Sequence, residues 1–293
     1  MALLRATSAA LFACVTSARF EPNWASLDAR VNPTWYDEAK VGIFIVGGVF
    51  SVPSWGTEKG GASGEWFENH LDTRDPAYLA YMSANYAPSF TYTDFAPALK
   101  YDLFNATEWA ALFAASGARY TVHLTKHHDG FTLWPSNTSA RWNAVEVGPR
   151  LDVVGEVTAA VKAAGLHAGL YHSLFEWNNP IYLADQATNF TSRAFVPKTM
   201  GELYDLVERY EPDLLWSDGD WDAPDTYWDA PTFLAWAAND SPVANSIVWN
   251  DRWGKGTTCI HGSFLTCSDR YSPGHIVNKK WENAMTLDAH SWG

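Results

Sequence analysis

The stretch TMGELYDLVERYEPDLLWSDG, residues 199–219, predicts a helix followed directly by a strand. Thr199 and Glu202 have the spacing of a capping box, which marks the start of a helix. Three apolar side chains then recur at helical spacing: Leu203, Leu206 and Tyr210. Pro212 ends the helix, and the short apolar run DLLWSDG is typical of a buried strand. The stretch therefore encodes one helix and strand unit whose strand ends at Asp218.

The same unit recurs along the chain. A predicted helix at Thr107–Ser116, with Trp109, Leu112 and Phe113 on its apolar face, precedes the strand RYTVHLTKHH. A second helix at Asp152–Ala164, with Val154, Val157 and Val161 on its apolar face, precedes LHAGLYHS. A third helix, TFLAWAA, precedes SIVWND. An earlier apolar strand, VGIFIVGG, begins at Val41. This alternation predicts parallel βαβ units. Because no glycine-rich phosphate fingerprint follows a strand, we expect a (β/α)8-type barrel rather than a nucleotide-binding sheet. Only five or six strands are recognisable, so the barrel is expected to be incomplete at its C-terminus.

Polar side chains gather where the predicted strands end. They are His127 and His128, Tyr171 and His172, Asp218, and Asp251 with Arg252. In a barrel these edges surround one pocket, so residues far apart in sequence converge there. A histidine pair at a strand end is by itself as compatible with structure as with function. The convergence therefore carries the functional argument.

Composition limits the classes of partner. The chain has 293 residues, 47% hydrophobic and 18% charged, with a net charge of -13. An acidic chain cannot neutralise a phosphate backbone, which argues against nucleic acid as a partner. The 16 Trp, 13 Tyr and 15 Phe include more rings than a core needs, and aromatic walls suit sugar rings.

The N-terminus and the cysteines predict an oxidising, secretory environment. Residues 1–18 have the short apolar run and small residues of a signal peptide. The catalytic domain is therefore expected at 19–293. No other segment of the sequence is apolar enough to cross a bilayer. Cys259 and Cys267 are expected to form a disulfide, with zinc binding beside His261 as the alternative. Four sequons predict glycosylation, the last weakened by the following Pro242: Asn105, Asn137, Asn189 and Asn239.

The predicted pocket has carboxylates, histidines and tryptophans but no evident nucleophilic serine or cysteine, which points to glycosidic bond cleavage. A retaining glycosidase needs an ionised carboxylate as nucleophile and a protonated one about 5 Å away as acid. Environment must separate the two roles, since both groups are acids.

The sequence resembles the α-L-fucosidases of glycoside hydrolase family 29, of the animal lysosomal or tissue type. The resemblance rests on stretches in family order, above all TKHHDGF and LLWSDG, with WYDEAKVGIFI, GLYHSLFEW, VWNDRWG and KKWENAMTLDAHSWG. It implies a retaining exo-hydrolase that removes terminal α-L-fucose from glycoproteins, glycolipids or oligosaccharides without metal or organic cofactor. Its partners would be fucosylated glycans, with a homo-oligomer left open and neither nucleic acid nor membrane involved. The expected location is the secretory pathway, lysosomal, vacuolar or secreted.

The resemblance also implies site residues. Asp218 matches the nucleophile. The residues matching the sugar site are Glu65, Trp66, His127, His128, Tyr171, Trp216 and Arg252, with Glu58 an alternative to Glu65. Two acids fall in stretches that carry the general acid/base in relatives, Asp269 and Glu282. We favour Asp269, because a loop fixed by the disulfide would hold it rigidly.

The chain departs from the family in two places. The family reads G-I-F-I-H-W-G-V after the first strand, whereas this chain has Val46 and Gly47 in place of the His and Trp. Family members also continue beyond the SWG element through further strands and a β-sandwich domain, which predicts a truncated gene product. The alternatives are a catalytically impaired fucose-binding pseudoenzyme and a metal-dependent hydrolase that uses His127, His128, His172 and Asp218 as ligands.

Overall fold

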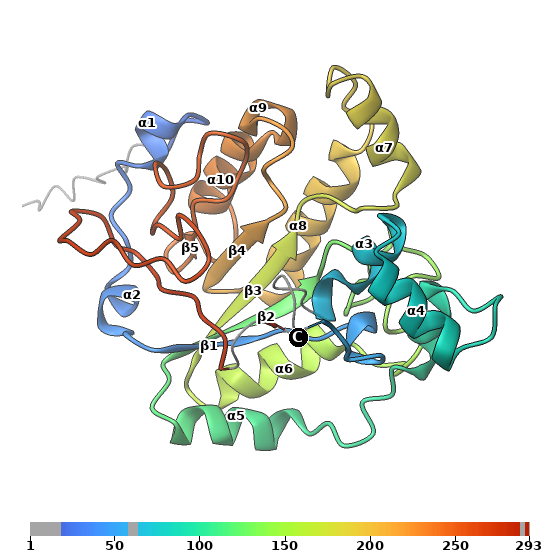
Figure 1. Cartoon of the computed structure of the whole chain (residues 1–293). Coiled ribbons are helices and arrows are strands. Elements are labelled where there is room, and N and C mark those ends of the chain that lie inside the picture. The colour runs from blue at the N-terminus through green and yellow to red at the C-terminus, as the bar shows by residue number, and fades with distance from the viewer. Residues whose placement is uncertain (1–18, 58–63, 288–290, 293) are drawn as a thin grey trace, which may run out of the picture.

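The protein is built on a five-stranded parallel sheet whose strands follow one another in sequence order, as the computed structural model shows (Figure 1). The structure describes residues 19–57, 64–287 and 291–292. The strands are β1 (Gly42–Ile45), β2 (Tyr120–Lys126), β3 (His167–Ser173), β4 (Leu214–Asp218) and β5 (Val248–Trp249). Every neighbouring pair is parallel. The parallel α/β class expected from the alternating pattern is therefore present, and closure into a barrel stays a prediction.

Helices connect the strands and cover the sheet. They are α1 (Trp24–Leu27), α2 (Thr34–Glu38), α3 (Phe67–Asp72), α4 (Pro76–Asn85), α5 (Ala106–Ala115), α6 (Val153–Ala163), α7 (Pro180–Ala187), α8 (Val196–Tyr210), α9 (Asp225–Trp228) and α10 (Ala230–Asn239). Short 3-10 helices occupy Val49–Ser51, Gly64–Trp66 and Tyr92–Ala98. Figure 1 shows α5 and α6 together below β1 and β2, and α3 and α4 grouped to the right of the sheet.

Capping side chains explain where two of the longer helices start. Asn105 accepts hydrogen bonds from the amides of Thr107 and Glu108, which caps α5. Asp152 caps α6 in the same way through the amide of Gly155. These caps satisfy amides that have no partner inside the helix, so the boundaries follow from local sequence.

Two local predictions were wrong. Helix α8 begins at Val196, three residues before the expected start, because Pro197 already fits the first turn. Thr199 is therefore a buried residue in the interior of the helix. Glu202 forms no capping box and instead makes ion pairs with Lys126 and Lys198. In α5 the expected apolar face is also shifted: Leu112 is exposed and Ala110 is buried, while Trp109 and Phe113 pack at the edge of the core.

The sheet has two faces with different tasks. Alternate residues of a strand point the same way, so each strand presents one set of side chains to each face. The side chains on one face line a pocket: Phe44, Leu124, Tyr171, Trp216 and Asp218. The other face packs on the helices and includes His172, which contacts the ring of Trp134. All five residues of β4 are buried, as expected for a strand covered on both faces.

An irregularity in β2 redirects the chain at its end. Leu124 pairs with Tyr171, but the next paired residue is Lys126, opposite His172, so one residue is skipped. Bulges of this kind often re-aim side chains beside functional sites. Here Lys126 points to the helix-covered face, where it is fully buried, and His127 lines the pocket on the other face.

The chain after β5 forms long loops that return to the sheet. Leu265 and Trp281 form an isolated parallel bridge, and the amide of Arg270 donates to the carbonyl of Ala284. The predicted signal peptide at 1–18 and Glu58 lie outside the described residues. Within the part of the chain that the structure describes, no helix combines the length and apolar character needed to span a bilayer.

Candidate active site

A pocket of about 290 Å³ opens at the C-terminal ends of the strands. Its lining includes nearly all the predicted site residues: Glu65, Trp66, His127, His128, Tyr171, Trp216, Asp218, Arg252 and Asp269. Six further lining residues were not predicted: Phe44, Leu124, Trp221, Arg270, Ala284 and Trp292. Val46, which replaces the family histidine, also lines it. The pocket therefore brings together residues separated by more than 200 positions.

Asp218, the last residue of β4, has a carboxylate fixed by two donors. The hydroxyl of Tyr171 donates to its Oδ2 over 2.7 Å, and Arg252 donates to its Oδ1 over 3.0 Å. Asp218 is buried, with only a small part of its side chain facing the pocket. Burial and the Asp218 charge raise the pKa of Tyr171 well above its usual value, so the phenol stays protonated as a donor. A carboxylate held in this way is oriented with one edge toward the pocket.

Arg252 joins Asp218 to a second carboxylate. Its other terminal nitrogen donates to Asp269 Oδ1 over 2.7 Å, and its Nε donates to Thr266 over 3.0 Å. The guanidinium lies 4.6 Å from the centre of the Trp216 ring, a cation–π contact. About half of the Asp269 side chain is exposed, in contrast to Asp218. One guanidinium thus holds a buried and an accessible carboxylate on the same side of the pocket.

The two histidines are neutral. Burial, followed by the charges of Lys126 and Arg252, lowers the pKa of His128 to about 3, and burial also lowers the pKa of His127. Ser173 donates its hydroxyl proton to the Phe175 carbonyl, so its oxygen accepts from Nδ1–H of His128 over 2.7 Å. The lone pair of His128 then resides on Nε2, 3.6 Å from Asp218 Oδ2. Such a ring accepts a hydrogen bond and suits a hydroxyl group.

Glu65 and Trp66 enter the pocket from the segment before α3. Glu65 is buried, and its Oε2 accepts from Ser291 Oγ over 3.2 Å and from the amide of Trp292 over 3.3 Å. Trp66 packs 5.8 Å from the ring of His128. Ser291 and Trp292 therefore contact a residue that lies more than 200 positions earlier.

Glu282 lies apart from this pocket. Its Oε1 accepts from Trp216 Nε1 over 2.9 Å and its Oε2 from Tyr120 over 3.0 Å. It lines a separate hollow beside β1. Burial raises the pKa of Glu282. In this structure Glu282 positions the indole of Trp216, whose ring stacks 5.6 Å from Tyr171.

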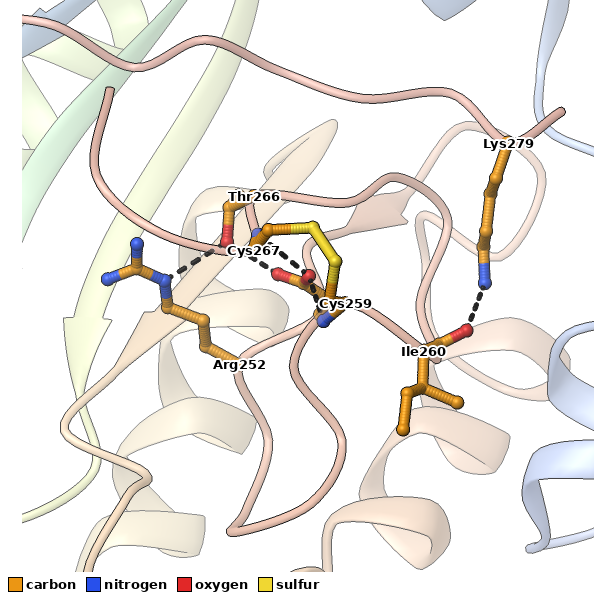
Figure 2. The surroundings of a disulfide bond; sticks show 7 residues. Arg252, Cys259, Ile260, Thr266, Cys267 and Lys279 are labelled. Carbon is orange, nitrogen blue, oxygen red and sulfur yellow. Dashed lines mark hydrogen bonds between the residues drawn. A yellow bond between two sulfur atoms is a disulfide. The ribbon is translucent and has the colours of Figure 1, made fainter. Parts of the chain in front are cut away.

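Asp269 lies two residues after Cys267, one of the two cysteines of the disulfide drawn in Figure 2. Cys259 and Cys267 are bonded, so the zinc alternative at these sulfurs is wrong. Asp251 Oδ2 accepts from the amides of both cysteines, over 2.7 and 3.1 Å, and Thr266 donates to its other oxygen. Asp251, expected in the pocket, is instead fully buried beneath this loop.

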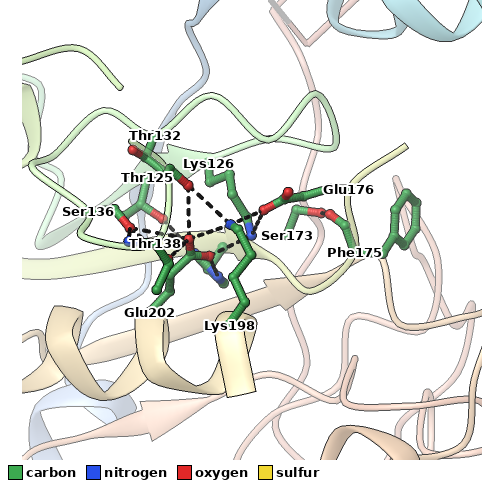
Figure 3. Close-up of polar contacts among 12 residues, drawn as sticks. Thr125, Lys126, Thr132, Ser136, Thr138, Ser173, Phe175, Glu176, Lys198 and Glu202 are labelled. Carbon is green, nitrogen blue, oxygen red and sulfur yellow. Dashed lines mark hydrogen bonds and ion pairs between the residues drawn. The ribbon is translucent and has the colours of Figure 1, made fainter. Parts of the chain in front are cut away.

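A buried charged cluster supports the other side of the site (Figure 3). Lys126 donates to Glu176 over 2.9 Å and to Glu202 over 2.7 Å, and Lys198 also contacts both carboxylates. Three hydroxyls donate to Glu202 as well: Ser136, Thr138 and Ser139. The cluster of Lys126, Glu176, Lys198 and Glu202, called here the buried tetrad, has two charges of each sign. Two of its members, Lys126 and Glu176, immediately precede His127 and Trp177 in the sequence.

The remaining predicted ligands do not converge. His172 lies on the helix-covered face, where its Nδ1 contacts Thr125, so it cannot join His127, His128 and Asp218 around one ion. Among the described residues, no group of three histidine, cysteine or acidic side chains is placed to hold a metal ion. The proposed set of four metal ligands is therefore wrong.

The sequon residues differ in their surroundings. Asn105, Asn137 and Asn189 are exposed. Asn239 is half-buried, and its side-chain nitrogen donates to the carbonyls of Phe20 and Ala235 over 2.8 and 2.7 Å. A glycan on that nitrogen would displace one of these bonds, so the first three positions stay predictions and Asn239 is disfavoured.

The loop just past β4 holds two residues that the sequence analysis did not identify, Asp220 and Trp221. Asp220 is buried and accepts from the amide of Gly254 over 3.0 Å. Burial, followed by the charge of Asp218, raises the pKa of Asp220 to about 6. Trp221 was also missed, although a tryptophan just past the end of a pocket-lining strand was a usable signal.

Comparison with known proteins gives one consistent result. The family model described as alpha-L-fucosidase matches residues 8–293. Tissue alpha-L-fucosidase of Mus musculus is 51% identical over 277 residues, which cover 94% of this chain and 60% of the mouse protein. Plasma alpha-L-fucosidase of Homo sapiens is 52% identical over 281 residues, covering 95% and 59%. The crystal structure of Thermotoga maritima alpha-fucosidase in complex with fucose superposes with a TM-score of 0.75 at 34% identity, covering 90% of this chain and 61% of that one. The chain thus spans about 60% of the length of the curated relatives it matches.

Proposed function

The chain belongs to the alpha-L-fucosidase family, and from that premise we propose that it hydrolyses terminal α-L-fucose from fucosylated glycans by a retaining, two-carboxylate mechanism. One observation carries the proposal. A buried carboxylate at the end of a strand, Asp218, shares a single guanidinium with a more exposed carboxylate, Asp269, at the edge of an open pocket. Bonding of both carboxylates to one guanidinium limits how far apart they can lie, and retaining enzymes hold their two carboxyl groups about 5 to 5.5 Å apart.

Asp218 would be the nucleophile. Its negative charge is compensated by Arg252 and by the Tyr171 hydroxyl, while neutral His128 faces it through Nε2. The carboxylate would attack the anomeric carbon and form a glycosyl ester as the bond to the leaving oxygen breaks. Arg252 and Tyr171 keep it in place for the second step, in which water releases fucose.

Asp269 would be the general acid and base, in preference to Glu282. A group in this role must reach the leaving oxygen and then a water molecule, which requires access from outside. Asp269 lines the pocket and is half exposed, whereas both carboxylate oxygens of Glu282 are bonded to Trp216 and Tyr120 away from the pocket. We therefore assign Glu282 to the positioning of Trp216.

The pocket walls suit a 6-deoxy sugar. Neutral His127 and His128, with Glu65, offer polar atoms for hydroxyl groups. Phe44, Leu124 and the Trp216 ring offer apolar surface for the C–H groups and methyl of fucose. We also infer that β1 to β5 are the first five strands of a (β/α)8 barrel, supported by their sequential parallel order and by a pocket at their C-terminal ends.

The test is hydrolysis of an aryl α-L-fucoside by the purified chain beside Asp218→Gly. We expect the parent to be active and the variant to lose about 10³-fold or more in kcat. Added azide should restore turnover in the variant, since a small anion fits where the carboxylate was removed, and it should yield a fucosyl azide. An inactive parent, or a fully active Asp218→Gly, would contradict the proposal.

A second candidate is a fucose-binding protein with little or no turnover. The observation that favours it is Val46, which lines the pocket where the family places a hydrogen-bonding histidine. Losing such a contact costs about 1 to 3 kcal/mol. Binding of fucose without hydrolysis of the aryl fucoside, measured on the same preparation, would support this candidate alone.

We propose the secretory pathway as the location, with lysosomal or secreted destinations. The Cys259–Cys267 disulfide supports an oxidising compartment. The relatives include proteins named as tissue and plasma enzymes. A fluorescent fusion that remained in the cytosol with reduced cysteines would count against this location.

A further inference from the structure

A second hollow adjoins the fucose pocket and has a different character. It has a volume of about 370 Å³, within the range of about 300 to 1,000 Å³ typical of small-molecule sites. It lies between α3, the segment leading into α7, α7 itself and the loop after β4. Figure 1 shows α3 beside the segment that runs to α7, and a hydrogen bond of 2.8 Å from Asn178 to Asp72 joins them. We call this hollow the outer groove.

The outer groove and the fucose pocket share two tryptophans, Trp66 and Trp221. The shared wall is continuous, because the His128 ring packs 5.8 Å from Trp66, 5.4 Å from Trp221 and 5.2 Å from Trp177. Trp221 is 42% exposed, so a large part of its ring is accessible to a ligand. An exposed ring that borders a sugar pocket offers a stacking surface for a second ring.

The groove combines this aromatic surface with polar groups that match a saccharide. Asn178 and Gln186 offer amide donors and acceptors, and Asp72 and Asp222 offer carboxylate acceptors for hydroxyl protons. Among the described residues that line the groove, none is a lysine or arginine. The cations near the site, Arg252 and Arg270, line the fucose pocket instead.

We propose that the outer groove binds a second, neutral sugar unit of the glycan that carries the fucose, and that Asp72 and Asp222 disfavour an anionic substituent on that unit. The inference rests on the proposed fucosidase function and specifies its substrate class. Aromatic stacking would supply the affinity, and the two carboxylates would supply discrimination against sialylated or sulfated units through like-charge repulsion. Neutral hexose or N-acetylhexosamine units fit this surface.

The kinetic test compares a fucosylated trisaccharide with an aryl α-L-fucoside on each variant of the purified chain. Leu183→Trp fills the groove from the exposed face of α7, and Asn178→Ala with Gln186→Ala removes the amides. Both variants should lower kcat/KM about tenfold for the trisaccharide and leave the aryl fucoside within about twofold. Arg270→Ala serves as the control for a second sugar on the other rim of the pocket. A selective trisaccharide loss in Arg270→Ala, with none in the groove variants, would overturn the proposal.

The charge test uses Asp72→Asn with Asp222→Asn, which keeps the shape of the groove. This variant should raise kcat/KM for a sialylated, fucosylated glycan by about threefold or more relative to its neutral counterpart. An unchanged ratio would refute the discrimination by charge.

Binding separates failure of this inference from failure of the proposed activity. The intrinsic fluorescence of the chain is titrated with N-acetyllactosamine, which needs no hydrolysis. A saturable change in the parent that weakens at least about fivefold in Leu183→Trp supports the groove even if the aryl fucoside is not hydrolysed. No saturable binding by the parent, or equal binding by Leu183→Trp, overturns it even if the chain is an active fucosidase.

Discussion

Replacing Lys126 with methionine should destabilise the protein far more than replacing an exposed cation in the same region. Lys126 is fully buried and donates to Glu176 over 2.9 Å and to Glu202 over 2.7 Å. Methionine retains most of the apolar stem but removes the charge, so the buried tetrad keeps two carboxylates and only Lys198. Breaking a buried ion pair by removing one partner costs about 3 to 5 kcal/mol.

The matched control is Arg209→Met. Arg209 lies in α8, like Glu202, and pairs with Asp205 one turn away over 2.8 Å, but both side chains are substantially exposed. An exposed pair of this spacing contributes about 0.3 to 0.5 kcal/mol. The two variants therefore remove the same kind of interaction at different burial, and the difference between them measures the effect of the buried environment.

Urea unfolding measures the loss, followed by circular dichroism and by tryptophan fluorescence to establish that both probes report one transition. We expect Lys126→Met to lose about 3 kcal/mol or more, and the added change Glu202→Gln to recover part of it by removing the uncompensated charge. If Lys126→Met and Arg209→Met lost the same free energy within about 0.5 kcal/mol, the reasoning would be refuted.

The pH dependence gives a second check on the tetrad. Burial alone would raise the pKa of Glu202, but Lys126 and Lys198 outweigh it and lower the pKa below its usual value. A carboxyl with a depressed pKa stabilises the folded state above its unfolded pKa, and this stabilisation is lost as the pH falls toward the folded pKa. The stability gap between the parent and Lys126→Met should therefore be largest near neutral pH and shrink below about pH 4.5.

Three further predictions concern the site and its surroundings. Asp269→Asn should lower kcat about 10²-fold or more on glycans with poor leaving groups and leave the hydrolysis of aryl fucosides largely unchanged. Glu282→Gln should affect both substrates alike. The reverse pattern would exchange the roles of the two acids. Val46→His should raise kcat/KM on the aryl fucoside about tenfold by adding a donor to the pocket, and an unchanged fucose affinity would count against that role. Burial lowers the pKa of His123 to about 4, so its folded form stays neutral while the unfolded chain takes up a proton below about pH 6.5. The parent should therefore lose about 2 kcal/mol more than His123→Phe between pH 7 and pH 5 in urea unfolding, and equal losses would contradict this.

The strand ends show how much of the site the sequence predicts. His127, Tyr171 and Asp218 each follow or end an apolar run, so their convergence follows from the parallel order of the strands. His172 is adjacent to Tyr171 in the same run and fails to join them, because successive residues of a strand face opposite ways. Local pattern identifies the edge, and strand register selects the residues.

The two candidate acids mark a limit of sequence reasoning. Asp269 and Glu282 lie thirteen positions apart in loops with no regular period. Their separation into a pocket residue and a support for Trp216 depends on the disulfide, on Asp251 beneath it, and on the bridge from Leu265 to Trp281. None of these contacts leaves a periodic trace in the sequence.

The sequence by itself determined the order of the five strands and of the helices that directly precede β2 to β5, and the strand that ends at Asp218. The spacing of Cys259 and Cys267 favoured a disulfide. These features are local, because hydrophobic period, caps and cysteine spacing act over a few residues. Only the tertiary structure decided that Lys126 turns away from His127, that Asp220 is buried, and that an aromatic, acidic groove continues from the pocket. Those outcomes depend on contacts between segments tens to hundreds of residues apart, and burial and charge pairing exist only once those segments have packed.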